Sequence, residues 1–154
     1  MKIIYIIFFI IILLFLQIGI LPHLKILGVF PNLIIISILS LSILKEWKKN
    51  FVWIIIAGLF LDVYSLNNII GVSIISLLGA GILVYFLNQN TFKKANILSL
   101  IITFLIGILA FYILSLILSL IFSFSFTFSI VLVIYNLILS LPVFWVMKKA
   151  IIIK

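Results

Sequence analysis

Six long apolar runs, separated by short polar interruptions, constrain this sequence more than any other feature. Hydrophobic residues make up 68% of the 154 positions, and charged residues only 8%. A soluble domain has roughly half apolar and a quarter charged residues, so this chain lacks the polar side chains that a water-soluble surface needs. The sequence therefore predicts an all-α polytopic membrane protein, with a single integral membrane domain over residues 1–154.

A membrane-spanning helix needs about 20 apolar residues, and the six runs are interpreted as six transmembrane helices on this basis. The second and third runs are short, so a re-entrant hairpin is the alternative for this pair. No small-residue cleavage site follows the first run before Pro22, and we therefore interpret that run as a retained helix and not as a signal peptide. The predicted helices cover residues 3–21, 29–44, 51–64, 69–87, 97–122 and 129–147.

The positions of the ten lysines predict the orientation of these helices, because cytoplasmic loops carry an excess of basic residues. With the N-terminus in the cytoplasm, all lysines except Lys25 fall on the cytoplasmic side, and both chain ends lie there. We expect the lysine clusters to contact anionic lipid headgroups, and not nucleic acid. The cytoplasmic lysines are Lys2, Lys45, Lys48, Lys49, Lys93, Lys94, Lys148, Lys149 and Lys154.

Acid–base side chains other than lysine and tyrosine are limited to Asp62, Glu46 and His23, and the chain has no cysteine. The predicted topology places Asp62 and His23 at the outer face and Glu46 at the cytoplasmic face, so no pair of carboxylates can form. His23 and Asp62 together would give a metal ion two protein ligands, fewer than zinc sites use. We therefore predict no catalytic residues, no metal site and no cofactor.

Asp62 is the only aspartate, and it lies between two apolar runs at the predicted outer end of the third helix. Placing a charged group beside a bilayer costs free energy, so such a residue is first considered as a candidate functional residue. The favoured interpretation is structural: Asp62 ends the helix, and its carboxylate accepts backbone N–H bonds from the following turn. The alternatives are an ion pair with Lys25, a contact with a partner protein, or ligand or ion binding.

Small and polar residues indicate where helices touch, because small side chains let backbones approach closely in lipid. Two stripes fit this pattern, and they serve either internal packing or a partner helix. The stripes are Ser73, Ser76 and Ala80 with Gly79 and Gly81 adjacent, and Ser115, Ser119 and Ser123.

The sixth run contains two polar residues and a proline. Asn136 and Ser140 share a face, and the Asn136 amide needs a hydrogen-bonding partner inside the bundle. Pro142 predicts a kink in this helix. Residues 122–128, just before this run, alternate Phe with Ser or Thr and predict an interfacial turn.

Three short motifs follow one another in a recognisable order and spacing. Pro31-Asn32-Leu33 opens the second helix, the sequence Gly-Leu-Phe-Leu-Asp over residues 58–62 ends the third, and Gly71 opens the fourth. Together with six short helices and almost no loops, these motifs resemble the rod shape-determining protein MreD family over essentially the whole chain. One departure is residues 65–70, Ser-Leu-Asn-Asn-Ile-Ile, where the family tends to have a Ser-Gly-x-Pro-Leu-like sequence.

The resemblance implies a non-enzymatic scaffold subunit of the bacterial cell-elongation complex in the cytoplasmic membrane. Such a subunit would dock an MreC-like single-pass membrane protein and act indirectly with MreB, RodA and a class B transpeptidase in peptidoglycan synthesis. With the packing argument above, the resemblance suggests a set of structural or partner-docking positions. These are Pro31, Gly58, Asp62, Gly71, Asn136 and Pro142.

The family is also similar in fold to the substrate-binding subunits of energy-coupling-factor vitamin transporters. A small-molecule-binding subunit of such a transporter is therefore the alternative function. Its pocket would need polar groups at the outer end. The predicted outer loops offer few donors beyond those of Asn67, Asn68, His23 and Lys25, which favours the scaffold.

Overall fold

The computed structural model describes residues 12–13, 15–23, 25, 28–44, 47–64, 69–90, 96–124, 126 and 128–152. Within these residues the chain is helical and contains no β-strand, which confirms the predicted all-α class. Most of the predicted first helix lies outside the described residues. The elements are η1 (Leu16–Ile20, a π-helical turn), η2 (Leu21–His23, a 3₁₀ turn), α2 (Leu33–Leu44), α3 (Trp47–Tyr64), α4 (Val72–Asn90), α5 (Ile97–Phe122) and α6 (Ile130–Ile152).

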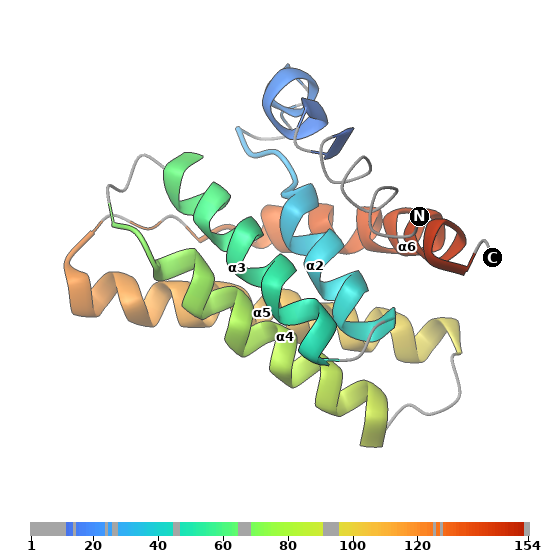
Figure 1. Cartoon of the computed structure of the whole chain (residues 1–154). Helices are drawn as coiled ribbons and strands as arrows, with labels where there is room; N and C mark the ends of the chain where they lie inside the picture. Colours follow the sequence, from blue (N-terminus) through green and yellow to red (C-terminus); the bar gives the residue numbers. More distant parts are fainter. Residues whose placement is uncertain are drawn as a thin grey trace.

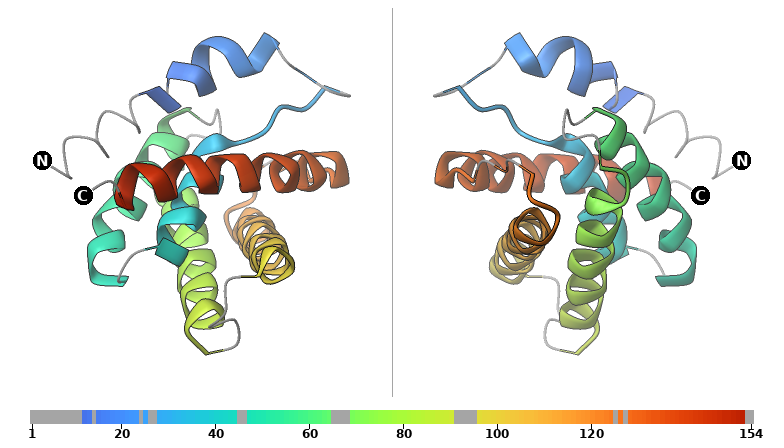
Figure 2. Two further views of the ribbon diagram at one scale, coloured as in Figure 1. Left: turned by 90° about the vertical axis from the view of Figure 1, so that its right-hand side faces the viewer. Right: turned by 90° about the vertical axis from the view of Figure 1, so that its left-hand side faces the viewer.

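Helix α2 lies at the centre of the bundle and contacts each of α3, α4, α5 and α6. Its residues from Leu33 to Ser42 are all buried, as expected for a helix that is apolar on every side. Around it, α4 lies between α3 and α5, and α6 packs against α2 and α5 (Figures 1 and 2). The turns η1 and η2 lie on the side of α2 that is far from α4 (Figure 2).

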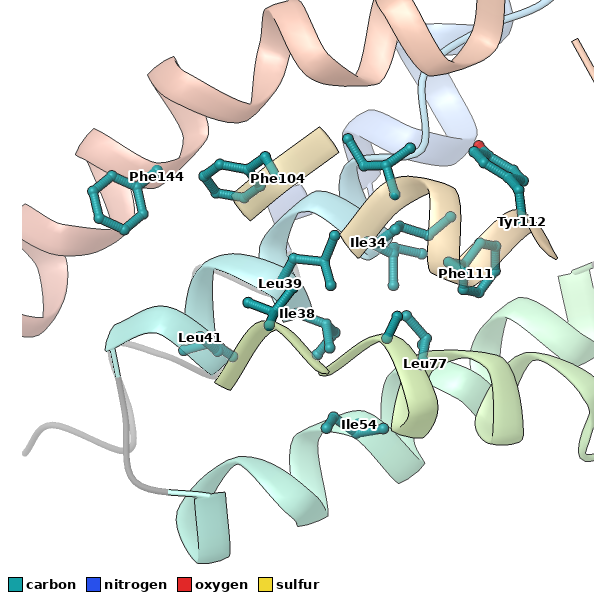
Figure 3. Close-up of a cluster of buried hydrophobic side chains, with 14 of the residues drawn as sticks. Ile34, Ile38, Leu39, Leu41, Ile54, Leu77, Phe104, Phe111, Tyr112 and Phe144 are labelled. Atoms are coloured by element: carbon teal, nitrogen blue, oxygen red, sulfur yellow. The ribbon is translucent and has the colours of Figure 1, made fainter. Parts of the chain in front are cut away.

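The main hydrophobic core surrounds α2. Figure 3 shows α2 side chains such as Ile38 and Leu39 directed toward side chains of the neighbouring helices. The rings of Phe104 on α5 and Phe144 on α6 meet edge to face, with centroids 6.0 Å apart. Because lipid tails are as apolar as these side chains, close packing and internal hydrogen bonds hold such a bundle together more than hydrophobicity does.

Small residues bring α4 and α5 together. The Ser115 hydroxyl donates a hydrogen bond of 3.0 Å to the Ser76 hydroxyl, and both side chains are buried. A methyl group on Gly79 would collide with the side chain of Leu114. The small-residue stripes therefore serve internal packing here. Ser123 is the exception, because it is exposed and ends α5 in the left-handed conformation (φ 54°).

Several helix boundaries differ from those predicted. Helix α5 has the predicted bounds, but α3 begins at Trp47 and not at residue 51, so Lys48 and Lys49 belong to its first turn. Lysine is a good helix former, so a run of lysines need not end or delay a helix. Helix α4 starts and ends three residues later than predicted, and α6 continues past Pro142 to Ile152. The kink at Pro142 stays a prediction.

Three described helices are long and apolar enough to cross a membrane: Val72–Asn90, Ile97–Phe122 and residues 130–150 of α6. Helix α2 has 12 residues and therefore measures about 18 Å. This is shorter than the hydrocarbon core of a bilayer, which is about 30 Å thick. Helix α5 ends in a turn at Ser123, and the interfacial position of the segment that follows stays a prediction. The ring centroids of Phe126 and Phe128 lie 6.3 and 6.1 Å from the ring centroid of Tyr112.

Candidate functional site

Asp62 lies in the last turn of α3, and its side chain is only 4% exposed. Its carboxylate accepts two backbone hydrogen bonds from the start of α4, from Gly71 N–H to Oδ2 and from Ser73 N–H to Oδ1, both 2.7 Å long. The first N–H groups of a helix have no partner within the helix, and they carry a partial positive charge. Asp62 therefore caps α4 from the preceding helix, which confirms the predicted backbone bonds.

Two glycines make this arrangement possible. Gly71 has a φ of +113°, a conformation that other residues rarely adopt, and this turns the chain so that its N–H points at Asp62. Gly58 lies where α3 and α4 approach each other, and a methyl group there would be 2.6 Å from the Cα atom of Ile74. We call Gly58, Asp62 and Gly71 the α3–α4 corner.

A second set of buried polar groups surrounds the start of α2. The Asn32 side chain caps this helix, because its Oδ1 accepts hydrogen bonds from Ile34 N–H (3.1 Å) and Ile35 N–H (3.2 Å). The Asn32 backbone N–H donates to Asn136 Oδ1 (2.7 Å), and Asn136 Nδ2 donates to the Tyr112 hydroxyl (2.8 Å). Asn136 therefore has the internal partners that the sequence predicted for it.

Gln17 completes this polar cluster from η1. Its Oε1 accepts a bond of 2.8 Å from Leu33 N–H, and its Nε2 donates to the Pro31 carbonyl at 3.3 Å. The Gln17 side chain is 2% exposed. One amide thus satisfies a donor and an acceptor at the entry to α2. Sequence reasoning missed Gln17, although a lone amide within an apolar run was a usable signal.

An open cavity of about 600 Å³ lies between the α3–α4 corner and the start of α2. Its described lining contains Asp62 and no lysine or histidine, and its aromatic members come from α3, α5 and the segments before α2 and after α5. We call it the Asp62 cavity. The aromatic lining residues are Phe30, Tyr64, Phe111, Tyr112, Phe124 and Phe126, and the polar ones include Gln17, Asn32, Ser73, Ser115 and Ser129.

The polar groups of the cavity come mainly from helix ends and not from loops. The expectation that the outer loops offer few donors stays a prediction. His23 and Lys25 are exposed and are not among the described lining residues. Asn67, Asn68 and Glu46 lie outside the described residues.

The predicted site residues fall into two regions. Pro31, Asp62, Gly71 and Asn136 lie at the end of the bundle that holds the Asp62 cavity, and Gly58 lies one turn along α3 from Asp62. Pro142 lies within α6, six residues beyond Asn136. The structure therefore brings Asp62 together with Gly71, and Asn136 together with Asn32 beside Pro31.

A third polar group lies at the opposite end of the bundle and was also missed. Asn50 on α3 is fully buried, and its Nδ2 donates a hydrogen bond of 2.7 Å to the Ser42 hydroxyl. Its Oδ1 is buried and has no hydrogen-bond partner within the described part of the chain. Asn88 of α4 donates to the Ile43 carbonyl at 3.1 Å. These bonds join α2 to α3 and to α4.

The motifs at these sites agree with a comparison to known families. The family model described as rod shape-determining protein MreD matches residues 1–150. The chain belongs to the MreD family. This confirms the resemblance inferred from the motifs, and it indicates a role in rod shape determination for an integral membrane protein. No curated protein and no solved structure matches the chain. The comparisons do not support the transporter-subunit alternative.

Proposed function

We propose that this chain is a non-enzymatic scaffold subunit of the bacterial cell-elongation complex in the cytoplasmic membrane. It docks an MreC-like single-pass protein and acts indirectly with MreB, RodA and a class B transpeptidase in peptidoglycan synthesis. The match of the MreD family to residues 1–150 carries this proposal. We further propose six transmembrane helices with both termini in the cytoplasm, as the lysine distribution predicts.

The surface proposed for docking is the exposed face of α3. Val52, Ile56, Leu59 and Val63 are exposed and follow one another at spacings of four, three and four residues. This spacing matches the apolar stripe of helices that pack side by side. Next to the stripe, an apolar groove of about 330 Å³ runs between α2 and α3, lined by Ile34, Ile38, Trp53, Ile56, Phe60 and Val63 among others. We call this surface the α2–α3 groove.

In this proposal the α3–α4 corner holds α3 in place for docking. The Asp62 carboxylate is buried and bonded to α4, so it supports the surface and does not itself form it. Gly58 fixes the distance between α3 and α4. Pro31 and Asn136 stabilise the start of α2, which forms the other wall of the groove.

Co-purification with an MreC-like protein from the same cells tests the proposal. Leu59→Trp and Val63→Trp should fill the α2–α3 groove and reduce the amount of partner recovered at least fivefold. Leu120→Trp, at a position that is 75% exposed on α5, is the matched control and should leave recovery unchanged. Each variant is first shown to elute as the wild type does on size exclusion.

If the wild-type chain recovers no MreC-like protein, the scaffold proposal is wrong. If Leu59→Trp and Val63→Trp recover the partner as well as Leu120→Trp does, the function stands and the groove is not the docking surface.

A further inference from the structure

We propose that the Asp62 cavity binds a neutral, membrane-soluble molecule that presents carbonyl oxygens. This inference concerns binding alone, goes beyond the scaffold function and does not depend on it. It rests on a difference between the hydrogen-bond donors and acceptors of the cavity lining. The amide oxygens of the lining are already bonded to backbone N–H groups, whereas two of its side-chain donors are unused.

The first unused donor is the hydroxyl group of Tyr112. This residue lies on α5, is only 4% exposed and belongs to the cavity lining. Its oxygen accepts a hydrogen bond of 2.8 Å from Asn136 Nδ2, but no group in the described part of the chain accepts the hydroxyl proton. A buried tyrosine hydroxyl usually finds a partner, because a buried polar group without one costs free energy. The unused proton therefore indicates a bound acceptor.

The second unused donor is the side-chain amide of Asn32. Its Oδ1 accepts two backbone N–H bonds at the start of α2, while its Nδ2 donates to no described residue. Asn136 bonds both to the Asn32 backbone N–H and to the Tyr112 hydroxyl, so a single amide lies between the two residues. A carbonyl oxygen has two lone pairs and can accept more than one bond. One ligand can therefore meet both donors.

This lining favours an acceptor over a cation as the ligand. The Gln17 Oε1 atom already accepts a bond from a backbone N–H, as the Asn32 Oδ1 atom does. A cationic ammonium group has donors only and would leave the unused protons of Asn32 and Tyr112 without a partner. The hydroxyl groups of Ser73 and Ser129, which also belong to the lining, can donate or accept and so suit either ligand.

A neutral acceptor fits the cavity better than an anion does. No described lining residue is basic. The first N–H groups of a helix can hold an anion, but at the start of α4 those of Gly71 and Ser73 already donate to Asp62. Taking an ion out of water without a charged partner costs far more free energy than burying a carbonyl that receives hydrogen bonds.

The size and the walls of the cavity suit a ligand with an apolar body. Its volume of about 600 Å³ lies within the range of roughly 300–1,000 Å³ that is usual for ligand sites. The ring centroids of Phe111 and Phe126 lie 5.3 and 6.3 Å from that of Tyr112, so aromatic faces surround the unused hydroxyl. Two kinds of membrane-soluble molecule have this chemistry: a quinone with ring carbonyls and a glycerolipid with ester carbonyls.

Native mass spectrometry of the full chain tests the inference, because it identifies bound molecules by their mass. The chain purified in detergent is titrated with menaquinone-4, which has ring carbonyls, or with dioleoylglycerol, which has ester carbonyls. Dioleoylphosphatidylglycerol is the anionic comparison. We expect saturable binding of a neutral probe, with one molecule per chain and a lower Kd than that of the anionic lipid.

Two substitutions each remove one unused donor. Tyr112→Phe removes the hydroxyl, and Tyr85→Phe is its matched control, because the Tyr85 hydroxyl also accepts a bond from a side-chain amide, that of Gln89, outside the described lining. Asn32→Asp keeps the oxygen that caps α2 but lacks the N–H donors, and Asn96→Asp, at the exposed start of α5, is its control. Each cavity variant should raise the Kd of the neutral probe about fivefold, as the loss of one hydrogen bond does.

Infrared spectroscopy of a probe labelled with carbon-13 at its carbonyl adds a readout that a general loss of stability does not produce. A hydrogen bond weakens the C=O bond, so the stretching frequency of the bound carbonyl should fall in the wild-type chain. It should fall less in Tyr112→Phe than in Tyr85→Phe. Equal frequencies in the two variants would show that the Tyr112 hydroxyl does not donate to the ligand.

The remaining outcomes decide the inference without touching the scaffold function. If neither neutral probe reaches saturation, or if the anionic lipid binds most tightly, the inference is wrong. It is also wrong if Tyr112→Phe and Asn32→Asp bind the probe as their controls do, because the probe then lies elsewhere on the chain. Saturable binding of menaquinone-4 alone supports a ring carbonyl as the ligand group, and binding of dioleoylglycerol alone supports an ester carbonyl. Recovery of an MreC-like protein is a separate measurement, so either proposal can fail while the other stands.

Discussion

At the scale of single residues, two polar side chains determine how the bundle is joined at one end. Asp62 joins α3 to the start of α4, and Gln17 joins η1 to the start of α2. Both side chains satisfy backbone N–H groups that a helix start leaves without partners. Both side chains are buried, so replacing either one leaves backbone N–H groups without the partner that it supplies.

Replacing Asp62 should destabilise the bundle in a graded way. Asp62→Ala removes both acceptors and should lower the free energy of unfolding by about 2 kcal/mol, as the loss of a helix cap combined with a charge-assisted bond does. Asp62→Asn keeps one acceptor oxygen and should lose roughly half as much. In detergent, the melting temperature should fall in the order wild type, Asp62→Asn, Asp62→Ala. If Asp62→Asn and Ala are equally stable, the two bonds do not act as described.

Replacing Gln17 should loosen η1 from α2. Gln17→Leu has a similar volume but leaves the Leu33 N–H and the Pro31 carbonyl buried without a side-chain partner, which costs about 1–3 kcal/mol. Gln17→Glu keeps the acceptor for Leu33 N–H but loses the donor to Pro31. Hydrogen–deuterium exchange over residues 31–36 should accelerate in Gln17→Leu. Unchanged exchange would contradict the role assigned to Gln17.

At the scale of elements, the spacing between α3 and α4 depends on Gly58. The structure places Ile74 backbone where a side chain on residue 58 would extend, so the helices themselves must separate to admit one. Gly58→Ala should therefore destabilise the chain by about 1–3 kcal/mol, the usual cost of overpacking. Gly19→Ala is the matched control, because no atom lies within 4 Å of its added methyl group. Equal melting temperatures for the two variants would show that α3 and α4 adapt without cost.

The sequence predicted some elements better than others. The bounds of α5 could be predicted because its long apolar run is followed directly by a changed pattern at residues 122–128. The start of α3 could not, because Trp47, Lys48 and Lys49 look like a loop by polarity although each is compatible with a helix. The backbone bonds of Asp62 and the buried partners of Asn136 could be predicted from the cost of burying a polar group in an apolar surrounding.

The Asp62 cavity could not be predicted from the sequence. Its lining comes from segments as far apart as Gln17 and Leu132, and no spacing in the sequence indicates that they meet. Phe30, Phe124 and Phe126 look like ordinary apolar residues in the sequence, and only the fold places them in the lining of one cavity. Tyr112 was missed for the same reason, because its partner Asn136 lies 24 residues further along the chain. Gln17 differs, because a lone amide within an apolar run was a usable signal.

At the scale of the whole molecule, the orientation in the membrane can be measured directly. The absence of cysteine means that single substitutions give unambiguous labels. In intact spheroplasts, Lys25→Cys should react with a membrane-impermeant maleimide, and Lys149→Cys should react only after the membrane is permeabilised. We expect this difference because the lysine clusters, which include Lys149, are proposed to lie in the cytoplasm, whereas Lys25 is proposed to lie outside. Labelling of Lys149→Cys from outside would overturn the proposed topology.

Asp62 is bonded directly to backbone groups that lie nine and eleven residues further along the chain, at the start of α4. A hairpin is commonly fixed by the residues of its own turn, but here the side chain of one helix attaches directly to the backbone of the next. An attachment through backbone N–H groups does not require a particular side chain at the donating position. The link between α3 and α4 can therefore persist when the side chain of Ser73 is exchanged for another.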